Sequence, residues 1–151
     1  NTFRVITYIM NGQIYHAPLS LRIGGGDSIL DNVHAGGMVI HVKDNGELER
    51  YAYRLGWGDR QEKFSSHPQT GVIFESHSIP NIDAVVNAAY IAHKKLPGIG
   101  IVSWDITLDL MSLPIIIEAN LLGQSTWFPQ VVSGKSLFGN NTKGILELLK
   151  R

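Results

Sequence analysis

The chain contains 151 residues, with 13 basic and 13 acidic side chains, 44% hydrophobic residues and no cysteine. A chain of this length and apolar content can bury one sizeable core, and its composition excludes an intrinsically disordered protein. The balanced charge argues against a general nucleic-acid binder, and the lack of cysteine excludes disulfides and zinc–thiolate sites. No apolar run reaches the roughly 18 residues of a membrane-spanning helix and no signal peptide is recognisable, so we expect a cytoplasmic location.

The first third of the sequence predicts two β-hairpins. Residues that favour strands fill Val5–Met10, and Asn11-Gly12 is a two-residue turn signal. The return strand, Gln13–Ile23, must bulge or break at Pro18, because proline cannot donate a ladder hydrogen bond. The second hairpin joins two further strands, Gly37–Lys43 and Glu47–Arg54.

The rest of the chain predicts a long loop, a helix, a third hairpin and a short terminal helix. Polar residues with glycines at 56–71 indicate the loop, and apolar residues at helical spacing predict a helix over Asn81–Lys95 that Asn81 can cap. The remaining elements are strands at Ile99–Asp109 and Pro114–Asn120 and a helix from Asn140 or Asn141 to Leu149. The pattern is α+β: an antiparallel β-sheet with helices packed on one face.

The third hairpin carries the most informative polar residues. If Leu110–Leu113 forms a four-residue loop, Asp105 lies directly opposite Glu118, and Asn120 projects from the same face opposite Ser103. The other face is expected to be the buried one, with the side chains of Trp104, Ile106, Leu108, Ile115 and Ile117.

Two carboxylates opposite each other on neighbouring strands repel, so this arrangement calls for a positive charge between them. Asp105, Glu118 and Asn120 offer hard oxygen ligands, which suit Mg²⁺ or Mn²⁺ better than zinc. The alternative is a solvated sheet face on which the carboxylates pair with lysine or arginine, and strand periodicity alone does not separate the two.

An Asp followed thirteen positions later by Glu-x-Asn, on two strands joined by a short loop, resembles the metal-binding signature of the ATP-grasp superfamily. Further motifs, in the same order along most of the chain, resemble its sugar-transfer-associated branch, which is found with polysaccharide-biosynthesis genes. These motifs are Asn1-Thr2-Phe3-Arg4-Val5-Ile6-Thr7, Asp31-Asn32 with Gly36-Gly37, His67-Pro68-Gln69-Thr70-Gly71, Ile79-Pro80 and Trp104-Asp105-Ile106.

The resemblance implies an ATP- and Mg²⁺-dependent ligase that joins a carboxylate to an amine through an acyl phosphate. By this resemblance, the metal ligands would be Asp105, Glu118 and Asn120. The remaining site residues it implies are Arg4 and Arg22 as catalytic arginines and Asn32 as a contact to phosphate or substrate. Phosphoryl transfer to a carboxylate fits such a site, because it needs metal and guanidinium charge where oxyanions develop.

The sequence departs from the family pattern at two points. Many ATP-grasp ligases place an arginine two residues before the metal-binding Asp, where this chain has Ser103. In the simple register set by Asn11-Gly12, Arg4 and Arg22 lie on opposite faces, so they converge only if a bulge forms near Pro18.

We interpret residues 1–151 as a single domain, the C-terminal ATP-grasp subdomain of a longer protein whose N-terminal remainder carries the lysines that clamp the nucleotide. We therefore expect the fragment alone to bind ATP weakly and not to turn it over. Its expected partners are ATP, a carboxylate substrate and that N-terminal remainder, with no nucleic acid and no membrane span. The alternative is a non-catalytic binding or scaffold module derived from the ATP-grasp fold.

Overall fold

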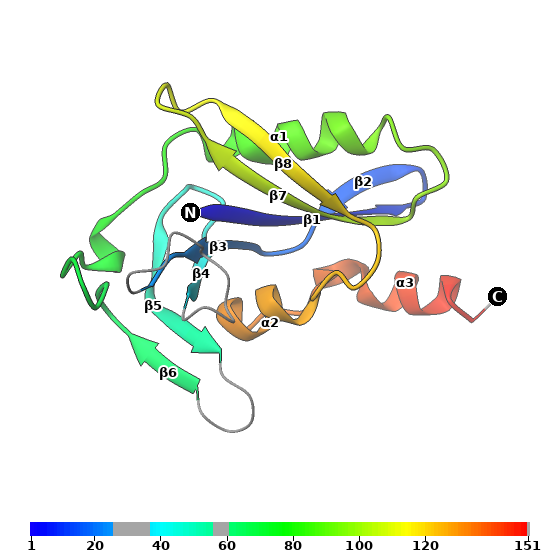
Figure 1. Ribbon diagram of the computed structural model, residues 1–151. Helices are drawn as coiled ribbons and strands as arrows, with labels where there is room; N and C mark the ends of the chain where they lie inside the picture. The colour runs from blue at the N-terminus through cyan, green and yellow to red at the C-terminus, as the bar shows by residue number, and fades with distance from the viewer. Residues whose placement is uncertain (26–36, 56–60, 151) are drawn as a thin grey trace.

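The computed structural model describes residues 1–25, 37–55 and 61–150. In these residues one antiparallel sheet has the strand order β6-β5-β4-β3-β1-β7-β8, and β2 also pairs with β1 (Figure 1). The strands are β1 (Thr2–Met10), β2 (Gln13–His16), β3 (Leu19–Ile23), β4 (Met38–Val42), β5 (Leu48–Leu55), β6 (Gln61–Phe64), β7 (Ile101–Leu108) and β8 (Pro114–Asn120). The helices are α1 (Ile82–His93), α2 (Trp127–Ser133) and α3 (Thr142–Leu148), with 3₁₀ turns η2 (Phe74–Ser76) and η3 (Gly139–Asn141). The α+β class with an antiparallel sheet is confirmed.

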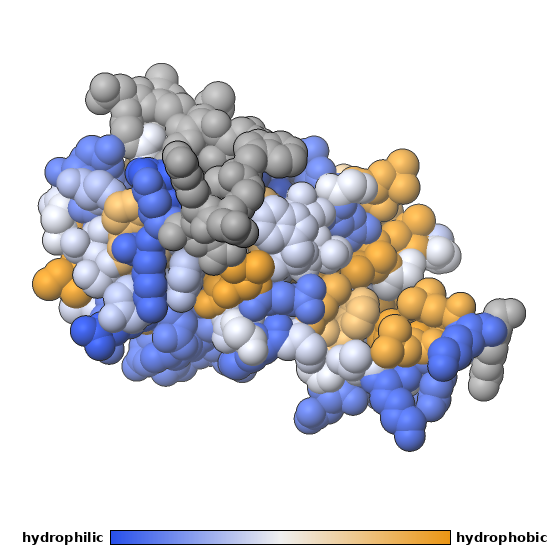
Figure 2. Space-filling view, turned by 90° about the horizontal axis from the view of Figure 1, so that it is seen from below, coloured by the Kyte–Doolittle hydropathy of each residue, from blue (hydrophilic) through white to orange (hydrophobic). Residues whose placement is uncertain are grey.

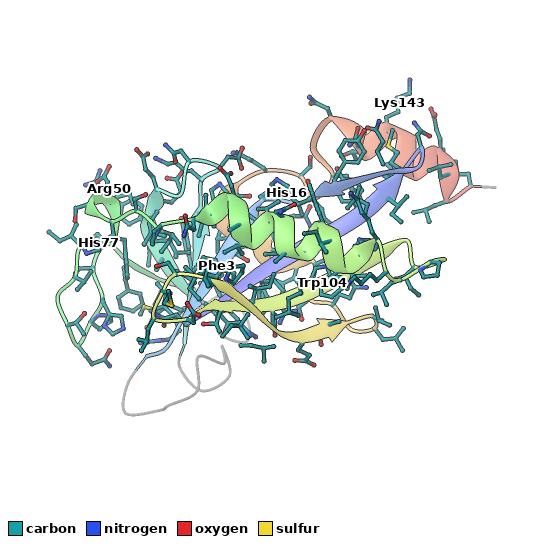
Figure 3. All side chains as sticks on the ribbon, turned by 90° about the horizontal axis from the view of Figure 1, so that it is seen from above. Phe3, His16, Arg50, His77, Trp104 and Lys143 are labelled. Atoms are coloured by element: carbon teal, nitrogen blue, oxygen red, sulfur yellow. The ribbon has the colours of Figure 1, made fainter. Side chains whose placement is uncertain are left out.

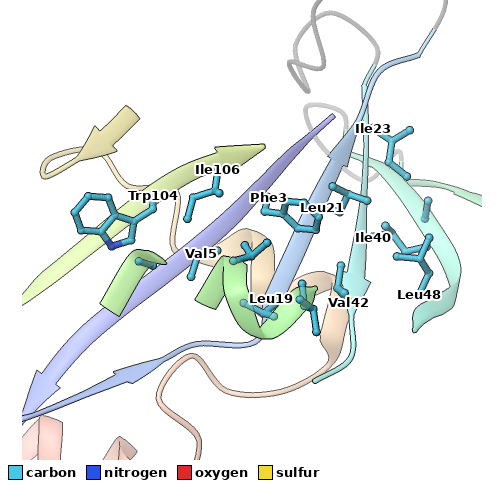
Figure 4. Close-up of a cluster of buried hydrophobic side chains, with 14 of the residues drawn as sticks. Phe3, Val5, Leu19, Leu21, Ile23, Ile40, Val42, Leu48, Trp104 and Ile106 are labelled. Atoms are coloured by element: carbon cyan, nitrogen blue, oxygen red, sulfur yellow. The ribbon is translucent and has the colours of Figure 1, made fainter. Parts of the chain in front are cut away.

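One face of the sheet carries the main core beneath α1. Helix α1 lies along this face (Figure 3) and turns Ile82, Val85 and Ala89 into the core. Alternate residues of the strands supply the other side of the contact, among them Phe3 and Ile106 (Figure 4). This alternation is the two-residue period of a strand, which sends every second side chain to the same face.

The opposite face is covered by α2 and α3. On α2, Phe128 and Val132 pack on Val39 of β4. On α3, Ile145 lies with Tyr8 and Ile101 around a small apolar hollow at the far end of β1. Helices therefore cover both faces, whereas the sequence predicted them on one face: α2, which was not predicted, and α3 both lie on the side opposite α1. Figure 2 views the molecule from this side and shows apolar side chains gathered toward the α3 end. None of the described helices is both long and apolar enough to cross a bilayer.

The return strand expected at 13–23 is interrupted at Ala17-Pro18, as the proline predicts. Thr7 pairs with His16, but Arg4 pairs with Ser20, so the two residues between Thr7 and Arg4 oppose the three residues 17–19. This extra residue is a β-bulge, which changes the face that the following side chains occupy.

Other local predictions are wrong in part. The predicted loop at 56–71 contains strand β6, while residues 56–60 lie outside the described part of the chain. Helix α1 begins at Ile82, and Asn81 does not cap it with its side chain: Asn81 is left-handed (φ 55°) and its amide donates to the Ser112 carbonyl (3.2 Å). Ile115 and Ile117 are 48% and 60% exposed rather than buried. Ile115 pairs with Thr107, which places it on the same face as Asp105 rather than beneath α1, and β8 is the edge strand of the described sheet.

The β7–β8 hairpin closes through five residues, 109–113, rather than four. Leu108 pairs with Pro114, and Asp109 organises the loop by accepting backbone hydrogen bonds from Met111 and Leu113, both 2.8 Å. A bulge at Ile117 then shifts the register by one residue. Because the bulge offsets the longer loop, Asp105 still lies opposite Glu118 and Ser103 opposite Asn120.

Candidate functional site

A row of polar side chains crosses the sheet on the face opposite α1, which we call the polar face. In successive strands the backbone pairs Glu118 with Asp105, Asp105 with Arg4, Arg4 with Ser20, and Ser20 with His41. Residues paired in this way point to the same side of a sheet. Five strands, from β8 to β4, thus bring one polar side chain each to a single line.

Asp105 stands at the centre of this row between two arginines. Arg4 Nε lies 2.8 Å from Asp105 Oδ1, and Arg22 Nη2 lies 2.9 Å from Asp105 Oδ2. Arg4 also donates from Nη2 to Asp105 Oδ2 (3.3 Å) and from Nη1 to the Ser103 hydroxyl (3.3 Å). Both guanidinium groups are therefore held by one carboxylate.

The bulge at Ala17-Pro18 is the reason that Arg22 reaches this site. Without it, Arg22 would point to the α1 side, as the simple hairpin register predicts. With it, Arg22 pairs with Thr2, two residues from Arg4 on the same strand and thus on the same face. The structure brings Arg4, Arg22 and Asp105 together, which the sequence left open.

Burial dominates the electrostatics of this group. Arg4 and Asp105 are only 7% and 4% exposed. Burial raises the pKa of Asp105 above its usual range, and this is opposed by Arg4 and Arg22 but reinforced by Glu118. Burial likewise lowers the pKa of Arg4, against the attraction of Asp105. Ion pairs held against such a cost are weak evidence for stability and more typical of functional sites.

The segment that leads from β8 to α2 contacts Arg4. Within it, the Gln124 carbonyl accepts hydrogen bonds from Arg4 Nη1 (3.3 Å) and from the Ser103 hydroxyl (3.4 Å). The Gln124 side chain in turn donates to the Leu121 and Ile101 carbonyls. This segment therefore fixes Arg4 from the side opposite the sheet.

Buried polar atoms without a hydrogen bond are concentrated here. Among the described residues seven side-chain atoms are buried in this way, six of them on strand residues of the polar face and one on Gln124 above it. They are Arg4 Nε, which still contacts Asp105 Oδ1 as an ion pair, Ser20 Oγ, Arg22 Nε, His41 Nε2, Asp105 Oδ1, Asn120 Nδ2 and Gln124 Oε1. Unsatisfied buried groups are rare in proteins, and a cluster of them indicates bound water, an ion or a ligand.

The donor set at this site fits a hard divalent cation. In the described part of the chain no three His, Asp or Glu side chains converge, so the carboxylates of Asp105 and Glu118 would share a cation with the Asn120 amide oxygen. Mg²⁺ is commonly held in proteins by one or two carboxylates, with substrate phosphates and water completing its shell. Glu118 is exposed and can turn to such an ion, whereas Asp105 is fixed by its arginines.

The expectation for Asn32 falls outside the described residues, as do Asp31 and Gly36 of the motif around it. The nearest described residue of the glycine stretch with a side-chain contact is Gly24, whose carbonyl lies 2.9 Å from His67 Nε2. Gly24, which follows β3, thus lies beside His67 of the His67-Pro68 motif.

Sequence reasoning missed Ser20, His41 and Gln124. Ser20 and His41 alternate with apolar residues in their strands, which signals two-sided strands but does not reveal that their polar sides align with Arg4. Gln124 carried no signal, because its role rests on its backbone carbonyl.

Fold and site together define an antiparallel α+β domain that gathers two carboxylates and two guanidinium groups on one face of its sheet. The chain belongs to the sugar-transfer associated ATP-grasp family, whose family model matches residues 1–144. The resemblance seen in the motifs is thereby confirmed. No curated protein and no solved structure matches the chain.

Proposed function

We propose that this chain is the metal-carrying part of an ATP- and Mg²⁺-dependent ligase that joins a carboxylate to an amine, acting in cell-surface polysaccharide assembly. Family membership supports the ATP-grasp relation, and its sugar-transfer association supports the polysaccharide context. The observation that carries the proposal is the group formed by Asp105, Glu118, Arg4 and Arg22 on the polar face. From the family resemblance we infer that the nucleotide-clamping lysines lie in another part of the protein.

In the proposed reaction, a carboxylate oxygen of the substrate bonds to the γ-phosphorus of ATP while the bond to the ADP oxygen breaks. An amine then attacks the acyl carbon and releases phosphate, giving an amide. Arg4 and Arg22 would bind the oxygens of the transferred phosphoryl group, where negative charge develops. Mg²⁺, when bound by Asp105, Glu118 and Asn120, would neutralise charge on the β- and γ-phosphates.

Release of the arginines from Asp105 is the step that this chain's geometry makes possible. In the present arrangement two positive and two negative side chains balance at the site. A cation shared by Asp105 and Glu118 would weaken the hold of Asp105 on Arg4 and Arg22, which frees their donors for phosphate. Arg22 Nε, which is buried without a hydrogen bond to any described residue, supplies a further donor.

The experiment is a titration with Mn²⁺ and ATP, followed by the paramagnetic broadening of backbone amide signals. In the wild-type chain we expect broadening at β7 and β8 that Mg²⁺ reverses, and no ATP hydrolysis by the chain alone. Asp105→Asn with Glu118→Gln should abolish it. Glu118→Gln alone, at an exposed position that does not threaten folding, should weaken it about tenfold or more.

A matched control removes two carboxylates elsewhere. Asp83→Asn with Glu147→Gln changes the net charge equally at exposed positions on α1 and α3, and should leave the broadening unchanged. If the site variants bind Mn²⁺ and ATP as the wild type does, the site assignment is wrong. If the wild-type chain is indifferent to both, the non-catalytic scaffold is the better description.

A further inference from the structure

A second hollow lies on the polar face, separated from Arg4 by an apolar plug. Ile6, Ala17 and Leu137 pack together there, and Ile6 is the next residue after Arg4 on the same face of β1. Beyond the plug a pocket of about 410 Å³ opens between the β1–β2 hairpin, β4 and the 135–141 segment. This volume lies within the usual range of small-molecule sites.

His41 lines this pocket, and one of its ring nitrogens has no partner among the described residues. The side chain is 2% exposed, and its Nδ1 lies 2.7 Å from the Leu19 carbonyl, which only accepts hydrogen bonds. Nδ1 therefore carries the proton, and Nε2 of the neutral ring is an acceptor. Nε2 is buried without a hydrogen bond to any described residue. A buried acceptor of this kind calls for a ligand or water that donates.

The remaining walls of the pocket combine an aromatic surface with polar groups of both signs. Tyr8 and Tyr15 stack with ring centroids 5.6 Å apart. Lys135 and Asp44 lie on the pocket wall, and in the described part of the chain Lys135 has no acidic partner. Asn140 adds an exposed amide to the same wall.

These groups match a polyhydroxylated ligand better than an anion. Hydroxyl groups can donate to His41 Nε2 and to Asp44 and can accept from Lys135, while the C–H face of a sugar ring packs on tyrosine. An anion would favour a protonated His41, but burial and the nearby Lys135 lower the pKa of His41, against weaker opposition from the Leu19 carbonyl, Glu49 and Asp44. We propose that this pocket is a saccharide-binding site, separate from the carboxylate–arginine site, with His41 Nε2 as its buried hydrogen-bond acceptor.

The test is a titration of the ¹⁵N-labelled chain with D-glucose, N-acetyl-D-glucosamine and D-glucuronate, each to about 10 mM and above, where weak binding is measurable. We expect at least one sugar to shift the signals of Tyr15 and Lys135 and the Nε2 resonance of His41. His41→Asn keeps a donor near the position of Nδ1 but lacks Nε2. That variant, and Lys135→Gln at an exposed position, should each weaken binding about tenfold, as for one lost hydrogen bond.

Lys143→Gln is the matched control, because Lys143 is an exposed lysine on α3 that does not line the pocket (Figure 3). It should bind sugar as the wild type does. The proposal is overturned if no sugar shifts these signals, if inorganic phosphate shifts them and sugars do not, or if Lys135→Gln and His41→Asn both retain wild-type affinity. None of these outcomes depends on Mg²⁺ or ATP, so the result is independent of the proposed ligase function.

Discussion

In the described part of the chain, each face of the sheet carries one buried histidine, and the two histidines differ in how their ring nitrogens are hydrogen-bonded. On the α1 side, His93 is fully paired: Nε2 donates to the Ile99 carbonyl (2.9 Å), Nδ1 accepts from the Thr7 hydroxyl (2.7 Å), and Trp104 Nε1 donates to that hydroxyl (2.8 Å). On the polar face, His41 uses one nitrogen, and the other has no hydrogen bond to a described residue. The difference shows that the polar groups around His93 are satisfied within the α1 face, whereas the polar face has hydrogen-bonding capacity left over, which we propose to serve ligands.

Arg4→Met on the polar face is the substitution from which we expect the largest change in the free energy of unfolding. Breaking a buried ion pair typically costs about 3–5 kcal/mol, and because Arg22 remains as a partner of the buried Asp105, we expect a loss near the lower end of that range. Urea denaturation followed by circular dichroism measures the change in the free energy of unfolding.

Arg50→Met is the matched control for Arg4→Met. Arg50 forms an exposed pair with Glu75 at 3.8 Å, which is expected to contribute less than about 1 kcal/mol. Equal stability changes for the two arginine variants would show that the buried group at Asp105 is not coupled as the geometry indicates.

A smaller difference in stability is expected between variants of two buried hydroxyl groups, that of Thr7 on the α1 face and that of Ser20 on the polar face. Thr7→Val removes the oxygen that links Trp104 to His93, and should cost about 1–3 kcal/mol because two buried groups lose their partner. Ser20→Ala removes a buried hydroxyl that has no hydrogen bond in the described part of the chain, and should leave the free energy of unfolding unchanged or raise it by up to about 1 kcal/mol.

Thermal and urea unfolding of the Thr7 and Ser20 variants give this comparison directly. A loss of stability in Ser20→Ala as large as in Thr7→Val would mean that the polar face is as fully satisfied as the α1 face, contrary to the distribution of unpartnered atoms.

The smallest expected effect is a dependence of stability on pH through His41. Its pKa in the folded chain is lowered from 6.5, chiefly by burial, so the unfolded chain takes up a proton first as the pH falls. Stability from the neutral ring is therefore present above pH 6.5 and is lost as the pH falls from 6.5 toward the folded pKa. The difference in free energy of unfolding between wild type and His41→Asn, measured from pH 8 to about pH 5, should shrink as the pH falls. A constant difference would contradict this assignment.

Two β-bulges determine which polar side chains meet at the site, and they limit how much of the site the sequence can predict. The pairing of Asp105 with Glu118 follows from a four-residue loop, yet the true loop has five residues and a bulge at Ile117 restores the count. The predicted pairing is therefore correct only because two deviations cancel, and neither deviation can be recognised in the sequence. The meeting of Arg4 and Arg22 required the second bulge, which Pro18 suggested without fixing its size.

The fold was predictable where periodicity is strong and less so at the edges. Helix α2 was missed because it is one of the short helices and contains Pro129, which is tolerated since the first-turn N–H groups have no partner within the helix. The isoleucines of β8 were misplaced because the five-residue loop puts Ile115 on the face of Asp105 and because Ile117 forms the bulge, and strand alternation reveals neither.

The extra residue at Ala17-Pro18 makes the length of one short connection more important than its composition. Deleting one residue between Met10 and Leu19 would invert β3 relative to β1, sending Arg22 into the core under α1 and Leu21 out of it. We therefore expect this stretch to accept many substitutions but no single-residue insertion or deletion. The meeting of Arg4 and Arg22 at Asp105 therefore depends on how many residues the chain has near Ala17, more than eighty positions before Asp105 in the sequence.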